Sequence, residues 1–366
     1  MELYSFYGYC KNPINEPNIL SLYGNLQSSY IEIDRFGFLN QFSNYKLGKS
    51  DNFTDFISDM PNSDEKFTEI FNKRILEIIE RSNKENLKIY VSWSGGVDSS
   101  AIVCGLLMSE IEKSKINILY SSKSIEEYPL LYEKLNENKI NMIDMSNDIG
   151  AVIFSNSIND GLLITGWCAD QLFGSIINQI YPDYYNKPFE HWIIDYSKTE
   201  NFDWNDSIEQ CKTAFEHYKL PVKTFSEWTW FMNFFIKWNY VKMSSYATIG
   251  KYTDRVINFY DTIDFQKWAI NNFDKLSALS QLKSNEYKLP LKKIILNYTK
   301  DKEYYNNKGK YGSWSNISAV QNKIKLAFLD NEGYKFYIQK FNVSYNRKHI
   351  FMIRTINQFL KNYIKE

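Results

Sequence analysis

The sequence predicts an α/β fold built on a doubly wound parallel sheet, and three observations predict it. Short β-branched and aromatic runs alternate with helix-like segments between about residues 86 and 175, which is the pattern of βαβ units. A Gly-Gly turn follows the first of these runs, as expected where a parallel strand passes into a helix. From residue 188 onward the pattern changes to longer helical segments with many aromatic residues, which indicates a helical half packed against the sheet.

The elements follow in order along the chain. Residues 1–47 contain strand-like pieces with period-two alternation, "LYSFYGY" and "SYIEIDRFGFLNQFSNY". A helix capped by Asn62 or Ser63 is expected next, because apolar residues recur at helical spacing until "NKEN" breaks the pattern. Four strands are expected at "KIYVSW", "KINILYS", "INMIDMS" and "GLLIT", with helices at "SSAIVCGLLMSEIE" and "SIEEYPLLYEKLNEN" between them.

These elements divide the chain into two expected domains. A small β-rich domain is expected over residues 1–62, followed by a larger domain over 63–366. Within the larger domain, residues 63–187 form the expected α/β core and residues 188–366 the expected helical portion.

Charge and cysteine usage exclude several classes of protein. Lys plus Arg equals Asp plus Glu at 43 each, so no polybasic surface for nucleic acid is expected. The four cysteines lack the spacing of a disulfide framework or a zinc site. There is no signal-peptide pattern, and the longest apolar cluster is too short to span a bilayer. We therefore expect a cytoplasmic protein with no membrane partner.

The turn "SWSGGVDSS" over residues 92–100 carries the strongest chemical signal. Gly95 and Gly96 can adopt positive φ and lack a Cβ, so backbone N–H groups can converge on an oxyanion. The following helix N-terminus adds a positive dipole end, and Ser94 and Ser99 add hydroxyl donors. Because Asp98 would repel a bound phosphate, a Mg²⁺ ion bridging the two is expected. The turn lacks the GxxxxGK[ST] pattern of a Walker A loop.

The residues SGGVDSS resemble the pyrophosphate loop of the ATP pyrophosphatase superfamily. The resemblance implies the adenine nucleotide α-hydrolase type of α/β fold. It also implies cleavage of ATP between the α- and β-phosphates, adenylation of a substrate oxygen and release of pyrophosphate.

A second motif, "LLITGWCADQLFGS" over residues 162–175, resembles the asparagine synthetase motif GEGADELFGG. The match includes Gly166 and Asp170. The resemblance implies that Asp98 and Asp170 together hold Mg²⁺ on the pyrophosphate of ATP, and that Gly166 lines the nucleotide pocket.

Three further segments resemble the same family. "IEIDRFGFLNQFSNY" resembles a segment of the glutaminase domain that precedes the synthetase, and "MSSYATIGKYTDRVINFYD" resembles the stretch ending in ExRxPFLD. From the latter, Arg255 is expected to belong to the acceptor pocket. "KGKYGSW" resembles the loop that bears the family's catalytic lysine, which implies that role for Lys310.

The chain also departs from the family pattern. Position 2 is Glu2 where a working glutaminase has its nucleophilic cysteine, so the N-terminal domain is expected to be a truncated remnant without glutaminase activity. Trp167 replaces the acidic residue nearest the reacting carboxyl and is expected to shape the acceptor pocket, because indole cannot accept a proton. Asp254 is the candidate for a substitute base.

We therefore expect an ATP-dependent carbon–nitrogen ligase of the asparagine synthetase type. It would adenylate the carboxylate of a small molecule or peptide, and an amine, ammonia or a partner protein would supply the nitrogen. One alternative is a degenerate, non-catalytic ATP-binding protein. The others are a tRNA-modifying enzyme with the same loop and an amide ligase that acts on a nucleotide carboxyl.

Overall fold

The core of the molecule is a five-stranded sheet in which every strand pair is parallel. The strand order is β4-β3-β2-β5-β6. The strands are β2 (Lys88–Ser92), β3 (Ile116–Tyr120), β4 (Asn141–Asp144), β5 (Gly161–Thr165) and β6 (Val256–Asn258). The computed structural model describes residues 2–4, 66–146, 159–174, 181–200, 205–238, 241, 254–278, 286, 288–309 and 327–329.

The four strands expected from the sequence are confirmed, and the fifth was not expected. β6 comes from the half of the chain in which the sequence pattern indicated helices only. It is three residues long, which is too short for an alternating pattern to stand out. Its place in the sheet comes from pairing with β5, in the register Leu163 to Val256.

The strand order places the end of β2 beside the end of β5. The chain winds from β2 outward to β3 and β4, and the sheet then continues on the other side of β2 with β5 and β6. The order therefore reverses between β2 and β5. In open parallel sheets ligands bind at such a point, past the carboxyl ends of the strands.

Both faces of the sheet are buried, as a doubly wound fold requires. Side chains alternate along each strand: Ile89 and Val91 belong to the large core cluster, while Tyr90 lies on the other face. Leu163 joins Tyr90 in the smaller cluster, and its neighbours Leu162 and Ile164 join the larger one.

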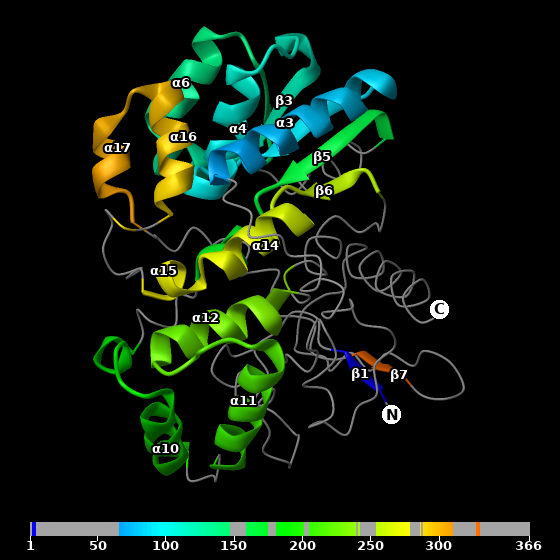
Figure 1. Ribbon diagram of the computed structural model, residues 1–366. Helices are drawn as coiled ribbons and strands as arrows, with labels where there is room; N and C mark the ends of the chain where they lie inside the picture. The colour runs from blue at the N-terminus through cyan, green and yellow to red at the C-terminus, as the bar shows by residue number, and fades with distance from the viewer. Residues whose placement is uncertain are drawn as a thin grey trace, which may run out of the picture.

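Helices α3 (Phe67–Lys84), α4 (Val97–Met108) and α16 (Leu289–Thr299) pack together next to the sheet (Figure 1). α3 begins at Phe67, so the expected N-cap at Asn62 or Ser63 is wrong. Lys66 precedes the first turn, and its backbone N–H donates to the carboxylate of Glu69 at 3.1 Å. This contact satisfies one of the backbone donors at the helix start.

The helix expected at "SIEEYPLLYEKLNEN" is two helices, α5 (Ser122–Glu127) and α6 (Pro129–Glu137). The break falls at Tyr128, whose φ of −145° is extended. Its cause is Pro129, because a proline ring disfavours helical backbone in the residue before it. The break brings the end of α5 close to the loop after β2.

The rest of the described chain is mostly helical. Helix α8 (Ala169–Phe173) follows β5. A separate group is formed by α10 (Phe189–Glu200), α11 (Asn205–Tyr218) and α12 (Phe225–Phe235). Between that group and the sheet lie α14 (Ile263–Asn271) and α15 (Phe273–Ala278) (Figure 1). The short 3-10 helices η2 (Lys113–Lys115) and η3 (Pro182–Tyr184) and the helix α17 (Lys302–Asn307) complete the set of described helices. Among the described helices, none combines the length and the apolar character needed to cross a bilayer.

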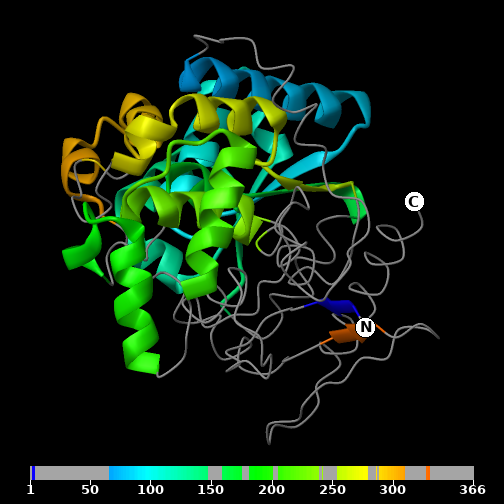
Figure 2. The same ribbon diagram turned by 60° about the horizontal axis from the view of Figure 1, so that its bottom comes forward.

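A second, two-stranded sheet pairs β1 (Glu2–Tyr4) with β7 (Ala327–Leu329) in antiparallel register. Both views show this pair apart from the five-stranded sheet (Figures 1 and 2). The pairing joins residues 2–4 to residues 327–329. The expected division at residue 62 did not include a sheet shared by the two ends of the chain. The DRFG segment lies outside the described residues.

Candidate functional site

Only one of the two glycines in the loop after β2 has the positive φ that the sequence allowed for both. Gly95 has a φ of +81°, in the region that favours glycine. A Cβ at Gly95 would lie 2.5 Å from the carbonyl oxygen of Ser124 and 2.7 Å from the Cβ of Glu127. Gly96 has an ordinary φ of −72° and is the N-cap of α4. Positive φ is therefore needed at the first glycine only, and the second begins the helix.

The serine side chains of this loop bond to the loop itself. The backbone N–H of Ser94 donates to the hydroxyl of Ser99 at 3.1 Å, and the two hydroxyls are 3.2 Å apart. The hydroxyl of Ser94 also accepts from the N–H of Gly96, at 3.4 Å. These bonds hold the turn in a closed shape. An arriving anion would have to compete with a weak bond for the Gly96 donor.

The loop after β5 packs directly against the loop after β2. A Cβ at Gly166 would lie 3.1 Å from both the Cβ of Asp98 and the backbone nitrogen of Ser99. Two residues later, Cys168 has a φ of +72° and caps α8. The motif that this segment resembles has glycine at this position, and glycine adopts a left-handed backbone without strain.

Helix α8 is fixed from behind by α12. The side-chain amide of Asn233 donates to the backbone carbonyl of Asp170 at 2.7 Å. The amide of Gln171 donates to the oxygen of the same Asn233 side chain at 3.2 Å, and the indole of Trp230 donates to the carbonyl of Leu172 at 3.1 Å. Gln171, which replaces a glutamate of the motif, thus takes part in a buried amide pair that positions α8.

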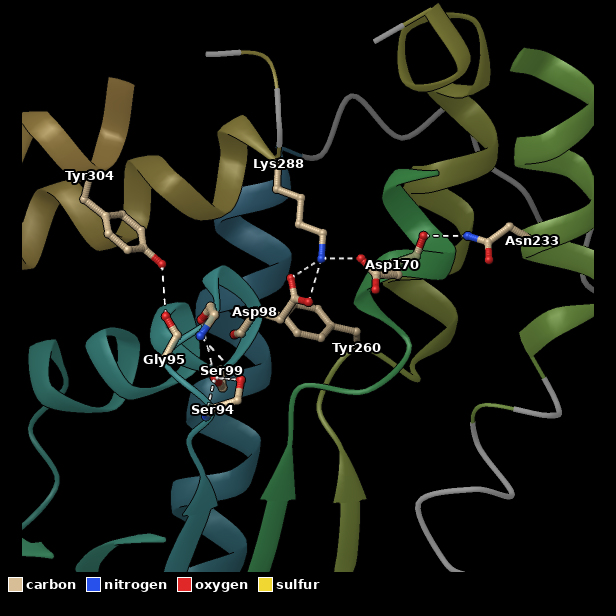
Figure 3. A network of polar contacts seen from close by, with 10 residues as sticks. Ser94, Gly95, Asp98, Ser99, Asp170, Asn233, Tyr260, Lys288 and Tyr304 are labelled. Atoms are coloured by element: carbon tan, nitrogen blue, oxygen red, sulfur yellow. Dashed lines mark hydrogen bonds and ion pairs between the residues drawn. The ribbon is translucent and has the colours of Figure 1, made fainter. Parts of the chain in front are cut away.

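Asp98 and Asp170 converge on one cation, the ammonium of Lys288 (Figure 3). The Nζ of Lys288 lies 2.5 and 2.6 Å from the two carboxylate oxygens of Asp98 and 2.6 Å from Oδ1 of Asp170. The Lys288 side chain is fully buried, whereas the carboxylates are 25% and 32% exposed. A single positive charge thus sits between the two aspartates, at the carboxyl ends of β2 and β5.

Tyr260 closes the site from the side of β6. Its hydroxyl donates to the backbone carbonyl of Asp98 at 2.9 Å, and its ring is fully buried. Burial raises the pKa of this phenol well above its usual value, and the negative charge of Asp98 raises it further. Tyr260 therefore stays neutral and acts as a hydrogen-bond donor.

The two aspartates supply the number of carboxylates that a magnesium ion typically takes from a protein. No cluster of three or more His, Cys, Asp or Glu side chains within the described ranges could hold a metal by itself. Mg²⁺ typically binds through one or two carboxylates and completes its shell with phosphate oxygens and water. The convergence of two carboxylates on a buried cation matches that requirement.

Two predicted site residues lie elsewhere. Asp254 and Arg255 precede β6 and therefore lie at the amino ends of the parallel strands. Asp98 follows β2 and lies at the carboxyl ends. A five-residue parallel strand spans about 16 Å, so the two edges are far apart. The carboxylate of Asp254 pairs with Arg81 at 2.7 Å and is 82% exposed. The guanidinium of Arg255 donates to the carbonyl of Asn159 at 2.7 Å.

Asp254 contributes instead to a groove along the outer edge of β6. The groove has a volume of about 260 Å³ and includes residues of α3, such as Arg74 and Arg81. It extends along β6 to Asp261. The structure therefore does not support Asp254 as the base of a reaction at Asp98, nor Arg255 as part of an acceptor pocket beside it.

The remaining predicted residues lie in or near the site. Trp167 is partly exposed and sits between Gly166 and Cys168, in the loop that bears Asp170. Lys310 lies outside the described residues. The described part of the same loop includes Lys308, which is buried.

Sequence reasoning missed Lys288, Tyr260 and Asn233. Lys288 stands before "LPLKK", at the start of α16, where nothing distinguishes it from the many other lysines of the chain. Tyr260 and Asn233 lie in aromatic stretches that read as core. Tyr260 reaches the site because β6 pairs with β5, and Lys288 and Asn233 reach it through packing of α16 and α12.

Comparison with known proteins adds no relative. The chain matches no family model, no curated protein and no solved structure.

Proposed function

We propose that the chain is an ATP-dependent amide-forming ligase, with a sheet of the adenine nucleotide α-hydrolase type. One observation carries the proposal: Asp98 and Asp170, from loops far apart in the sequence, meet at one cation position where the strand order reverses. Chance packing rarely brings two carboxylates to a buried ammonium at that edge, because partly buried charges are costly to gather.

The loop beside this position can take the phosphates. The N–H groups of Gly95 and Gly96 and the amino end of α4 provide a positive surface for an anion. Asp98 and Asp170 would hold Mg²⁺ together with phosphate oxygens. The ion would neutralise charge on the departing pyrophosphate.

The reaction proposed at this site has two steps. A substrate carboxylate oxygen attacks the α-phosphorus of ATP, the bond to the bridging oxygen breaks, and pyrophosphate leaves. The amine nitrogen then attacks the acyl carbon, AMP leaves, and the amine gives up a proton. Trp167 has no basic atom, and Asp254 lies at the opposite edge of the sheet, so neither is assigned the role of proton acceptor.

Lys288 gives the site a charge that can move with the reaction. Its ammonium balances the two carboxylates here. With a magnesium nucleotide bound, the same ammonium is within reach of phosphate oxygens, where it would offset the charge that develops on the leaving group. This role uses the long, flexible lysine side chain.

Binding tests the proposal without knowledge of the acid substrate. Titration calorimetry with α,β-methylene-ATP and Mg²⁺ should show binding to the wild type and its loss in Asp98→Asn and Asp170→Asn. Asp274→Asn, an exposed aspartate on α15, is the matched control and should bind normally. Equal binding by the two site variants, or no magnesium-dependent binding by the wild type, would overturn the proposal.

An ATP-binding protein without ligase activity is the second candidate, and Gln171 favours it. The family glutamate is here an amide that serves packing, through its bond to Asn233. ATP–pyrophosphate exchange in the presence of mixed carboxylic acids separates the two, because only a ligase exchanges label. Among the described cysteines, Cys104, Cys168 and Cys211 are all buried, which does not favour a sulfur-transfer role for these three.

A further inference from the structure

A buried ion pair lies against the loop after β2. The Nζ of Lys308 is 2.8 Å from Oε1 of Glu127, and the two side chains are only 7% and 13% exposed. Lysine and glutamate are seldom buried to this degree unless they are paired, as these two are. Neither residue has a part in the chemistry proposed above.

Glu127 touches the loop at the place where an anion would bind. Its Oε1 lies 3.6 Å from the position of a Cβ on Gly96, and its Cβ lies 2.7 Å from the position of a Cβ on Gly95. A carboxylate at this place repels phosphate unless a cation accompanies it. Lys308 is that cation.

The loop itself holds Lys308 in place. The hydroxyl of Tyr304, on α17, donates to the carbonyl of Gly95 at 3.3 Å (Figure 3). The ring of Tyr304 stacks on Tyr128, with centroids 3.8 Å apart and planes at 17°. Lys308 follows α17 directly and its N–H donates to the carbonyl of Tyr304 at 3.0 Å. The position of α17 therefore places Lys308 beside the loop that contains Gly95 and Gly96.

The charge of Lys308 affects a second lysine, Lys292. Lys292 on α16 is buried, and its ammonium donates to the carbonyl of Tyr305 at 3.2 Å. Burial lowers the pKa of Lys292, and the positive charge of Lys308 lowers it further, to about 8. Lys292 and Lys308 thus place two amino groups on the α16–α17 side of the loop.

We propose that Lys308 is a phosphate-binding residue of the nucleotide site, and that Glu127 holds its ammonium beside Gly96 until the pyrophosphate portion of ATP arrives. The inference rests on the proposed function. In the empty site Glu127 compensates the lysine. In the occupied site the ammonium turns to the phosphate oxygens, and Lys288 and Lys308 lie on either side of the pyrophosphate.

The proposal predicts opposite effects for the two partners. Lys308→Met should weaken binding of pyrophosphate with Mg²⁺ about tenfold, because a charge-assisted hydrogen bond is lost. Glu127→Gln should strengthen binding about threefold, since it frees the lysine and removes a negative charge beside the loop. Lys308→Arg keeps the charge and should stay within about threefold of the wild type.

Calorimetric titration of the full chain with magnesium pyrophosphate, and separately with magnesium α,β-methylene-ATP, measures these effects. Lys293→Met, an exposed lysine on α16, is the control and should bind as the wild type does. Thermal melts of each variant show whether it is folded. If Lys308→Met does not fold, the gain in binding expected of Glu127→Gln and the near wild-type binding expected of Lys308→Arg still decide.

A purely structural ion pair gives a different result. Lys308→Met and Glu127→Gln would then weaken binding in parallel with their loss of melting temperature, or leave it unchanged, and either outcome overturns the inference. Failure of the wild type to bind both probes would overturn the proposed function as well. Normal wild-type binding with no gain in Glu127→Gln would overturn this inference alone.

Discussion

Replacing Lys288 by methionine tests the central feature of the site. Methionine has a similar length and fills the same buried space without the charge. The substitution leaves Asp98 and Asp170 facing each other, with their shared cation gone. The backbone at position 288 is left-handed in either case, with a φ of 47°, so this strain is the same for both side chains.

The expected magnitude follows from the distances. Each aspartate has an oxygen within 2.6 Å of Nζ, so these two oxygens are at most about 5 Å apart. At an effective dielectric constant of 20, two unit charges at that separation repel by about 3 kcal/mol. The carboxylates are 25% and 32% exposed, so water screens part of this energy. We expect Lys288→Met to lower the free energy of unfolding by about 2 kcal/mol.

Urea unfolding at pH 7.5, followed by tryptophan fluorescence, measures the loss. Magnesium should reverse the loss of stability. We expect 10 mM Mg²⁺ to raise the free energy of unfolding of the variant by more than that of the wild type, because in the variant the two carboxylates can bind the ion in place of the ammonium.

Lys293→Met on the exposed side of α16 is the matched control and should change stability by less than about 0.5 kcal/mol. If Lys288→Met lowers the free energy of unfolding by no more than Lys293→Met does, the two carboxylates do not depend on the ammonium. An equal effect of Mg²⁺ on variant and wild type would mean that the pair does not select a divalent ion. Either result would refute the reasoning.

Three further predictions concern the same region. Gly166→Ala should cost about 1–3 kcal/mol in urea unfolding and abolish nucleotide binding, because the added methyl would meet Asp98 at 3.1 Å. The pKa of Lys292, about 8, lies below that of a lysine in the unfolded chain. Between pH 8 and pH 10 the unfolded chain therefore binds more protons than the folded protein, and the free energy of unfolding of the wild type rises with pH. Lys292→Met should flatten that rise by about 2 kcal/mol, and a variant curve parallel to the wild type would contradict it. Burial raises the pKa of Cys104 and Cys211, so a disulfide reagent should label them only after unfolding.

Helix and strand types in the first half of the chain were predictable because their signals are local. The four runs of apolar residues that became β2 to β5 stand between turn residues, and each is long enough to recognise. β6 was not predictable, because three residues in a largely helical region carry no period. The break at Tyr128 has a local signal, because Pro129 disfavours helical backbone in the residue before it.

The site was predictable in part for the same reason. Gly95 and Asp98 belong to one turn, and Gly166 and Asp170 belong to another, so each pair is visible within a few letters of sequence. The expected contribution of Asp254 and Arg255 had no such basis. It rested on resemblance to the ExRxPFLD stretch, and the direction of β6, which the sequence did not reveal, places both residues before that strand.

By itself the sequence determined the parallel sheet and the two loops at its carboxyl edge, because glycine conformation and apolar runs act over a few residues. Only the tertiary structure decided which charges meet there. Lys288, Lys308 and Glu127 come from three separate elements, and their partners are chosen by packing of α5, α16 and α17 around the loop. A buried ammonium is stable only where the fold supplies carboxylates, and that supply cannot be read from neighbouring residues.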